Sequence, residues 1–201
     1  MIKLKLIVAG AKSVGKTSLI RRYCTGSFMI DTLSTIGVDF MVKTLNIEGT
    51  EVNFSIWDFA GENKFRQLFP SYCSGASGAL LLFAITNEDS FADIDEWLEL
   101  INNASGKIIK FLIASKCDLD DWALSKEEIL KFQKRHKLDA FVETSAKTGK
   151  NVDEVFYNIG KAIIEMSMRK CPNCGELVQK EVLFCTFCSE NFEKEKYTQN
   201  K

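Results

Sequence analysis

The sequence contains no apolar run long enough to cross a bilayer. Its longest strongly apolar stretch covers residues 79–85, far short of the roughly 20 residues that a membrane-spanning helix needs. The apolar start "IKLKLIVAG" is not followed by a signal-peptide cleavage region. We therefore expect neither secretion nor membrane insertion, and we predict a soluble, cytoplasmic protein.

Lipidation signals and an excess of charge of either sign are also missing. Residue 2 is Ile rather than Gly, and the sequence ends in "TQNK", so neither myristoylation nor prenylation is indicated and we expect no direct lipid anchor. The 26 basic and 27 acidic residues nearly cancel, which gives no overall attraction to nucleic acid or anionic membrane. Partners must therefore be sought in local features, and nucleic acid is not expected among them.

Histidine is almost absent. His136 is the only one and lies in the basic stretch "KRHK", which favours a solvated surface position, and no Ser or Cys nucleophile site can be built with it.

Of the seven cysteines, Cys24, Cys73 and Cys117 have no paired spacing and are expected to be inert thiols.

What the sequence does contain is an alternation of β-rich and helical segments. Apolar runs are typical of buried parallel strands, and two β-rich runs separated by "EGT" indicate an antiparallel hairpin. The expected strands are residues 3–9, 38–47, 51–59, 79–85, 110–115 and a short one near 140–144. This order predicts a three-layer α/β domain over residues 1–168.

The expected helices follow these strands. Ser90 is the predicted N-cap of a crossover helix, and Ser125 with Glu128 forms the pattern of a capping box before a helix that ends near Arg135. A helix over residues 151–166 carries an apolar stripe.

A phosphate-binding loop is predicted at residues 10–17. "GAKSVGKT" fits the pattern G-x-x-x-x-G-K-[ST] between a predicted strand and a predicted helix. Small residues let backbone N–H groups wrap a phosphate, Lys16 meets the β and γ oxygens, and Thr17 ligates magnesium. The alternative is an ordinary glycine turn, which the strand and helix context disfavours.

Four further motifs follow in order: "STIGVDF", "WDFAGE", "SKCD" and "ETSAK". With the phosphate loop they resemble the Ras-like small GTPases, closest to the Rab branch, over about residues 3–167. The resemblance implies a P-loop GTPase fold with a six-stranded, mostly parallel sheet, and it implies GTP as the substrate and Mg²⁺ as a cofactor.

The resemblance also assigns roles to residues. Phe28 would flank guanine, Lys116 would lie along the base, and Asp118 would accept from its N1 and N2 hydrogens, although an Asp after a strand is more often a cap or turn residue. The implied nucleotide-binding residues are Ser13, Val14, Gly15, Lys16, Thr17, Ser18, Phe28, Thr35, Gly61, Lys116, Asp118, Ser145, Ala146 and Lys147. The implied magnesium ligands are Thr17, Thr35 and Asp58, and the implied catalytic residues are Lys16, Thr35, Gly61 and Glu62.

Protein partners are implied by the same resemblance. Phe40, Trp57 and Tyr72 match an aromatic triad that Rab-like proteins present to effectors, whereas aromatic residues on strands are otherwise often plain core. An exchange factor and an activator are further expected partners.

Three residues depart from the family pattern. Glu62 stands where relatives carry the glutamine that orients the attacking water, so we expect slow hydrolysis. Lys12 replaces a small residue, and it could block an activator's arginine, replace it, pair with Glu62 across the γ-phosphate, or point into solvent. Ser115 replaces an asparagine, which removes a tether to the phosphate loop and should lower guanine affinity.

The segment "CPNCGELVQKEVLFCTFC" holds four cysteines in two Cys-x-x-Cys pairs. Because nothing indicates export, this spacing favours metal over disulfides, and Cys171, Cys174, Cys185 and Cys188 are predicted to bind Zn²⁺, with iron as the alternative. The spacer is expected to form a small hairpin. We predict a zinc ribbon at 169–190 and a disordered tail at 191–201.

The sequence therefore predicts a GTP-binding switch that hydrolyses GTP slowly. The ribbon stands where many relatives carry a lipidated tail, so it is predicted to serve docking or targeting. One alternative is a GTP-bound scaffold without hydrolysis. Another is a translation-type GTPase whose ribbon contacts RNA, which the balanced charge of residues 169–201 disfavours.

Overall fold

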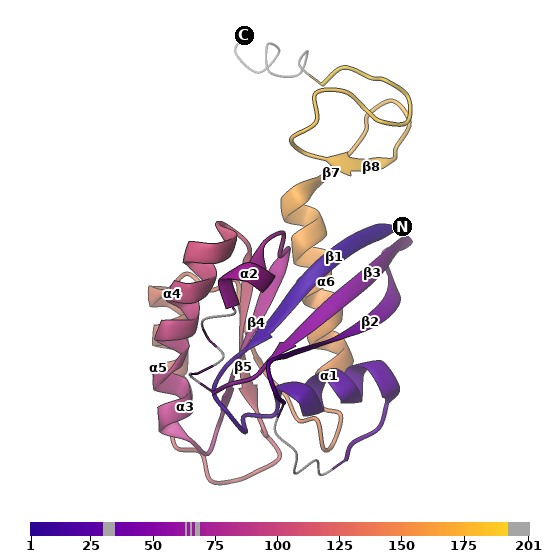
Figure 1. The fold of residues 1–201 in the computed structure, drawn as a ribbon. Coiled ribbons are helices and arrows are strands. Elements are labelled where there is room, and N and C mark those ends of the chain that lie inside the picture. The colour runs from indigo at the N-terminus through magenta and orange to yellow at the C-terminus, as the bar shows by residue number, and fades with distance from the viewer. Residues whose placement is uncertain (30–34, 63, 65, 67–68, 193–201) are drawn as a thin grey trace. The chain divides into compact units, whose positions relative to one another are not determined.

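The computed structural model describes residues 1–29, 35–62, 64, 66 and 69–192. The chain divides into two compact units, Met1–Gly160 and Lys161–Lys201, which are described in turn (Figure 1). Among the described residues, no helix is both long enough and apolar enough to span a membrane.

The first unit is built on a six-stranded sheet with the strand order β2-β3-β1-β4-β5-β6. Only β2 and β3 pair antiparallel, and all other neighbours run parallel, so the predicted mostly parallel sheet is confirmed. The strands are β1 (Ile2–Ala9), β2 (Val38–Ile47), β3 (Thr50–Phe59), β4 (Gly78–Ala84), β5 (Ile109–Ser115) and β6 (Ala140–Glu143).

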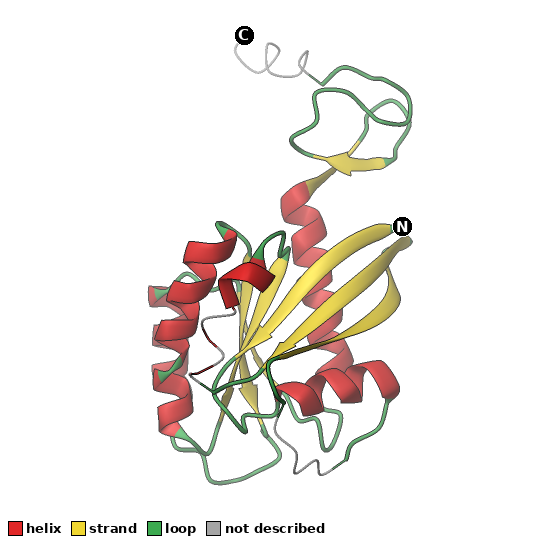
Figure 2. Cartoon of the chain, in the orientation of Figure 1, coloured by secondary structure: helices red, strands yellow, loops and turns green. Residues whose placement is uncertain are grey.

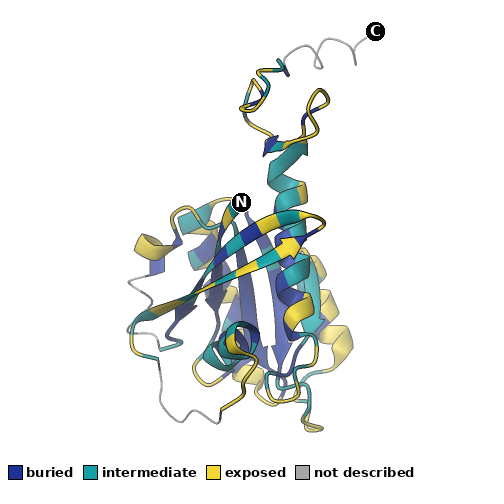
Figure 3. Cartoon of the chain, turned by 90° about the vertical axis from the view of Figure 1, so that its right-hand side faces the viewer, coloured by how far each residue is buried: buried dark blue, intermediate teal, exposed yellow. Residues whose placement is uncertain are grey.

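The burial of these strands follows their sequence pattern. Every residue of β4 is buried, as expected for a parallel strand covered on both faces, and the middle of the sheet is accordingly the most buried part of the unit (Figure 3). The predicted hairpin is confirmed as well. Glu48 and Gly49 both have positive φ angles, as a two-residue turn between twisted strands requires.

Helices cover both faces of the sheet (Figure 2). Their bounds are α1 (Lys16–Thr25), α2 (Phe69–Cys73), α3 (Glu88–Ala92), α4 (Ile94–Ser105), α5 (Lys126–Arg135) and α6 (Val152–Ser167). Tyr23 of α1 stacks on Phe156 of α6 with ring centroids 3.9 Å apart. On the other face Phe69, Trp97 and Ile129 share one buried cluster with Ile7 of β1. The predicted three-layer arrangement is therefore present.

The predicted N-cap is confirmed for α5 and is wrong for α3. Ser125 and Glu128 form the predicted capping box. Ser90, however, is not an N-cap: Asn87 is the cap of α3 and accepts from the Ser90 N–H. The buried Ser90 hydroxyl instead accepts from the Ala84 N–H at 3.0 Å. Burial of this hydroxyl against β4 decides its role, and a local sequence pattern cannot show that.

The second unit contains the end of α6 and the cysteine segment. Its strands β7 (Met168–Lys170) and β8 (Leu177–Gln179) pair antiparallel. The expected hairpin within the spacer is therefore wrong, because β8 pairs with the residues before the first cysteine.

A small core holds this unit together. Cys171, Val178, Cys185 and Phe192 are buried in one cluster, and the Arg169 guanidinium lies 3.7 Å from the centre of the Phe192 ring. Phe192, the second residue of the expected tail, thus packs in this core, and residues 193–201 lie outside the described residues.

Candidate functional site

The first unit contains a cavity of about 420 Å³ that collects residues from all of the predicted nucleotide-binding motifs. Of that predicted set, its lining includes Ser13, Val14, Gly15, Lys16, Thr17, Ser18, Phe28, Thr35, Gly61, Lys116, Asp118, Ala146 and Lys147. Ser145 is completely buried and reaches the site through its hydrogen bond to Asp118. A volume of this size suits a small-molecule ligand.

One end of the cavity is formed by the loop between β1 and α1. A Cβ atom on Gly10 would lie 2.1 Å from the Leu82 carbonyl oxygen, so only glycine lets the loop leave the sheet at this point. The Lys16 ammonium donates to the Gly10 and Ala11 carbonyls at 2.8 and 2.6 Å. Burial lowers the pKa of Lys16 to about 8. This end therefore combines a cation with the N-terminus of α1, an arrangement that attracts phosphate.

Three oxygen-bearing side chains converge beside Lys16. The Thr17 hydroxyl donates to Asp58 Oδ2 at 2.5 Å and lies 2.9 Å from the Thr35 hydroxyl. Within the described part of the chain, Asp58 Oδ1 is buried without a hydrogen-bond partner, and burial raises the pKa of this carboxyl. A buried carboxylate oxygen without a partner needs a cation or a donor. Because all three groups offer hard oxygen ligands, they fit a magnesium ion.

The other end of the cavity is marked by Asp118. Its Oδ1 accepts from the Ser145 hydroxyl at 2.6 Å, and Lys147 Nζ lies 3.8 Å from its Oδ2. The hydrogen bond from Ser145 is the main cause of its lowered pKa, so the carboxylate is charged and can accept two further donors. This arrangement suits the recognition of a base that presents N–H groups.

Ser115 corrects one expectation from the sequence. Its hydroxyl is buried and lies 2.5 Å from the Val14 carbonyl and 2.8 Å from the Phe83 carbonyl. The tether to the phosphate loop is therefore present rather than lost. A serine side chain is shorter than an asparagine side chain, and only the closeness of the Val14 carbonyl to the end of β5 shows that the hydroxyl can still contact it.

Lys12 and Glu62 form an ion pair at the mouth of the cavity, with Lys12 Nζ 2.8 Å from Glu62 Oε1. Lys64 Nζ lies 2.8 Å from the second carboxylate oxygen. The hydrogen bonds from Lys12 and Lys64 lower the pKa of Glu62 to about 2. The sequence left several contacts open for Lys12, and the structure shows one of them, the contact between its ammonium and the Glu62 carboxylate.

The aromatic residues Phe40, Trp57 and Tyr72 form one contiguous surface group. The Phe40 and Tyr72 rings each lie 5.6 Å from the Trp57 ring, measured between centroids. Phe40 is 57% exposed and Tyr72 is 37% exposed, so neither is plain core.

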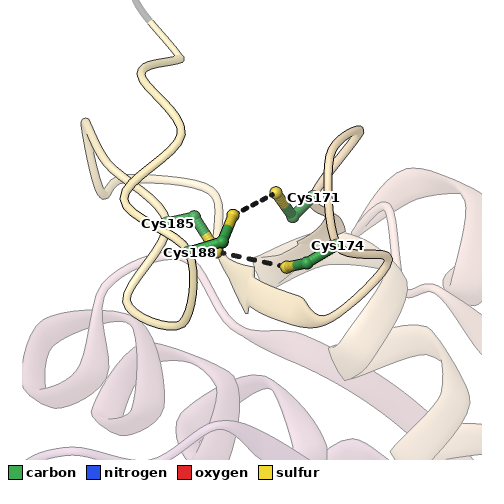
Figure 4. Close-up of side chains that lie close together, drawn as sticks. All are labelled: Cys171, Cys174, Cys185 and Cys188. Carbon is green, nitrogen blue, oxygen red and sulfur yellow. Dashed lines mark hydrogen bonds between the residues drawn. The ribbon is translucent and has the colours of Figure 1, made fainter.

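The four paired cysteines of the second unit converge on one point (Figure 4). All four Sγ atoms lie within 4.8 Å of one another. The separations are 3.6 Å for Cys171–Cys188 and for Cys174–Cys185, close to the roughly 3.8 Å expected between sulfurs around tetrahedral zinc. This donor set fits a closed structural zinc site.

The two cysteine pairs have matching backbone hydrogen bonds. Gly175 donates to the Cys171 carbonyl at 2.8 Å, and Ser189 donates to the Cys185 carbonyl at 2.9 Å. Gly175 and Ser189 both have positive φ angles. Each pair is therefore a tight turn that directs two sulfurs to the same side, a feature that the sequence spacing alone did not show.

Some lining residues of the cavity were not predicted. Met29, Leu119 and Thr144 border it, and each directly adjoins a predicted position. Their place next to a motif was the only signal in the sequence.

Comparison with known proteins agrees with this geometry. Residues 5–165 match the Ras family. The chain is 39% identical to Ras-related protein Rab-18 of Lymnaea stagnalis over 164 residues, and this matched region covers 81% of each of the two chains. It is 38% identical over 162 residues to Ras-related protein Rab-13 of Canis lupus familiaris, covering 80% of this chain and 79% of the relative. The cysteine pairs lie beyond the family match.

Proposed function

The chain belongs to the Ras family, whose members are GTP-binding switches, and on that premise we propose that it hydrolyses GTP slowly and docks to partners through its cysteine unit. One observation carries the nucleotide part of the proposal. A single cavity has the phosphate-binding loop at one end and the Asp118 carboxylate at the other, so it matches the two chemically different ends of a guanine nucleotide.

The proposed roles of the residues follow from their places in the cavity. Lys16 and the N–H groups from Ser13 to Ser18 bind the phosphates, while Asp118, Lys116, Phe28 and the 145–147 segment hold the base. Thr17, Thr35 and Asp58 would hold magnesium, which would supply positive charge for the phosphate oxygens. Gly61 would direct its N–H to the γ-phosphate.

Slow hydrolysis is proposed because of Glu62. An ionised carboxylate accepts from water but cannot donate, and it brings negative charge towards a transition state that is itself negative. The hydrogen bonds from Lys12 and Lys64 lower the pKa of Glu62 from 4.5 to about 2, and even the ordinary value leaves this carboxyl ionised near neutral pH. We therefore expect an unassisted rate at or below about 10⁻⁴ per second.

Single-turnover phosphate release from protein loaded with GTP and Mg²⁺ tests this proposal. Glu62→Gln should accelerate release, because a neutral amide can both donate and accept. Glu51→Gln, an exposed acid outside the cavity lining, is the matched control and should leave the rate unchanged. A slower Glu62→Gln variant would mean that Glu62 is an effective catalytic residue. Release from neither protein would favour the GTP-bound scaffold.

The docking part of the proposal rests on the second unit. We propose GTPase and ribbon domains at residues 1–168 and 169–192, with zinc on Cys171, Cys174, Cys185 and Cys188. Leu183, Phe184 and Phe187 are each more than half exposed, which suits contact with a protein partner. Phe184→Ser with Phe187→Ser should abolish partner capture while the zinc content stays unchanged.

Effector contact is proposed for the aromatic group of Phe40, Trp57 and Tyr72. Exposed, mutually packed aromatic rings supply large contact areas at low entropic cost. Phe40→Ala should weaken the binding of a GTP-dependent partner without changing nucleotide affinity, because Phe40 does not line the cavity.

A further inference from the structure

The Lys12–Glu62 ion pair lies at the phosphate end of the cavity. Lys16, the residue that meets the β and γ oxygens in a P-loop, is bound to the carbonyls of Gly10 and Ala11. Lys12 follows Ala11 in the same loop, and both Lys12 and Glu62 line the cavity. The pair therefore lines the cavity together with the lysine that meets the phosphates in a P-loop.

The backbone fixes the two partners close together. A Cβ atom on Gly61 would lie 2.4 Å from the Ala11 carbonyl carbon and 2.4 Å from the Lys12 nitrogen. Gly61 thus packs directly on the phosphate loop, and the following residue, Glu62, is held next to Lys12. Only a glycine permits this approach, because any side chain would collide with backbone atoms.

The pair is exposed enough to exchange partners. The side chain of Lys12 is 55% exposed and that of Glu62 is 26% exposed. An ion pair of this exposure contributes little free energy. A γ-phosphate carries about two negative charges and three acceptor oxygens, against one negative charge on the carboxylate. It can therefore compete with the carboxylate for the Lys12 ammonium, whereas GDP carries no group that reaches this far.

We propose that the Lys12–Glu62 pair is a latch that discriminates GTP from GDP: the pair stays closed over GDP, and the γ-phosphate of GTP takes Lys12 from Glu62. This inference rests on the proposed function. It makes Lys12 a specificity-determining residue for the terminal phosphate, supplied by the chain itself. Glu62 then acts as the competitor that sets how strongly the γ-phosphate is favoured.

The test measures the affinities of GDP and of a non-hydrolysable GTP analogue, both with Mg²⁺, by competition against fluorescent GDP. Lys12→Ala should lower the GTP-to-GDP affinity ratio about tenfold, since it removes a charged hydrogen bond to the γ-phosphate alone. Glu62→Gln should raise the ratio by up to about fivefold, the worth of an exposed ion pair.

The double variant decides whether the two residues act as one device. With Lys12 already removed, Glu62→Gln should raise the ratio clearly less than it does in the wild-type background, because no partner remains to be released and only the repulsion between Glu62 and phosphate is relieved. If Glu62→Gln raised the ratio equally in the Lys12→Ala background, Glu62 would act only by repelling phosphate, and the latch would be refuted.

Lys64→Ala is the matched control. Lys64 binds the other oxygen of the same carboxylate, but it does not appear among the described residues that line the cavity. Its removal should change the ratio less than twofold. If the wild-type protein bound neither nucleotide, the proposed function itself would fail. If both nucleotides bound and Lys12→Ala left the ratio unchanged, only the latch would fail.

Discussion

The Ser115 hydroxyl, at the end of β5, lies 2.5 Å from the carbonyl oxygen of Val14 in the phosphate loop. This hydrogen bond ties the base-recognition motif to the phosphate loop, although 101 positions separate the two residues. Ser115 also lies 2.8 Å from the Phe83 carbonyl. One buried serine thus connects the two ends of the cavity.

Removing this hydroxyl should weaken both folding and nucleotide binding. Ser115→Ala removes the single buried proton donor that lies between the Val14 and Phe83 carbonyls, which costs about 1–3 kcal/mol. Urea denaturation should show that loss, and the affinity for GDP should fall as the phosphate loop loosens.

Ser90→Ala is the matched control for this variant. Ser90 is as well buried and bonds to the backbone of β4, but it lies outside the cavity lining. It should lower stability by a similar amount without changing GDP affinity. Equal affinities for wild type and Ser115→Ala would contradict the tether.

Base selectivity should rest on Asp118. The carboxylate can accept the two hydrogens that guanine presents, whereas an amide would offer a donor where an acceptor is needed. Asp118→Asn should weaken GTP binding by roughly tenfold to a hundredfold and favour xanthosine triphosphate. Competition titration with both nucleotides measures this change, and an unchanged preference would remove Asp118 from the base site.

The cysteine unit should bind one zinc ion per chain. About 30 residues bury too little apolar surface to fold alone, so the metal must supply free energy of folding. Elemental analysis should find zinc in the wild-type protein, and the double variant Cys185→Ser, Cys188→Ser should lose it. Cys24→Ser, which removes a thiol outside the quartet, should keep it.

Loss of zinc should leave nucleotide binding nearly intact. All described residues that line the cavity belong to the Met1–Gly160 unit, whereas the quartet belongs to the other. If the double variant unfolded the whole chain or abolished GTP binding, the two units would not be independent.

Acid should release the Glu62 ion pairs. The pKa of Glu62 is about 2 in the folded protein, against an ordinary 4.5. A carboxyl with a lowered pKa stabilises the fold fully above 4.5, and that contribution disappears as the pH falls towards 2. The melting temperature of Glu62→Gln should therefore fall less between pH 5 and pH 3 than that of the wild type. Both proteins carry the same ribbon, so zinc loss affects them equally, and identical pH profiles would show that the pairs contribute nothing to stability.

Local patterns were sufficient for most elements of the fold. The apolar run of β4, the turn at Glu48–Gly49 and the capping box at Ser125 are decided by residues close in sequence, so their periodicity and turn chemistry were readable. The G-x-x-x-x-G-K-T spacing likewise located the phosphate loop. The cap at Ser90 and the pairing of β8 were misjudged, because both depend on which distant backbone lies alongside.

The sequence by itself determined which groups the site contains: a lysine and a threonine after a glycine loop, two key aspartates, and four cysteines in pairs. Only the tertiary structure decided which of them act on one another. Ser115 reaches Val14, Lys12 reaches Glu62, and β7 supplies the partner of β8 because packing of the sheet and of the small core brings segments together that are far apart in the chain. Chemical identity is a property of each residue, whereas distance between residues is set by the fold, and an ion pair or a tether depends on distance.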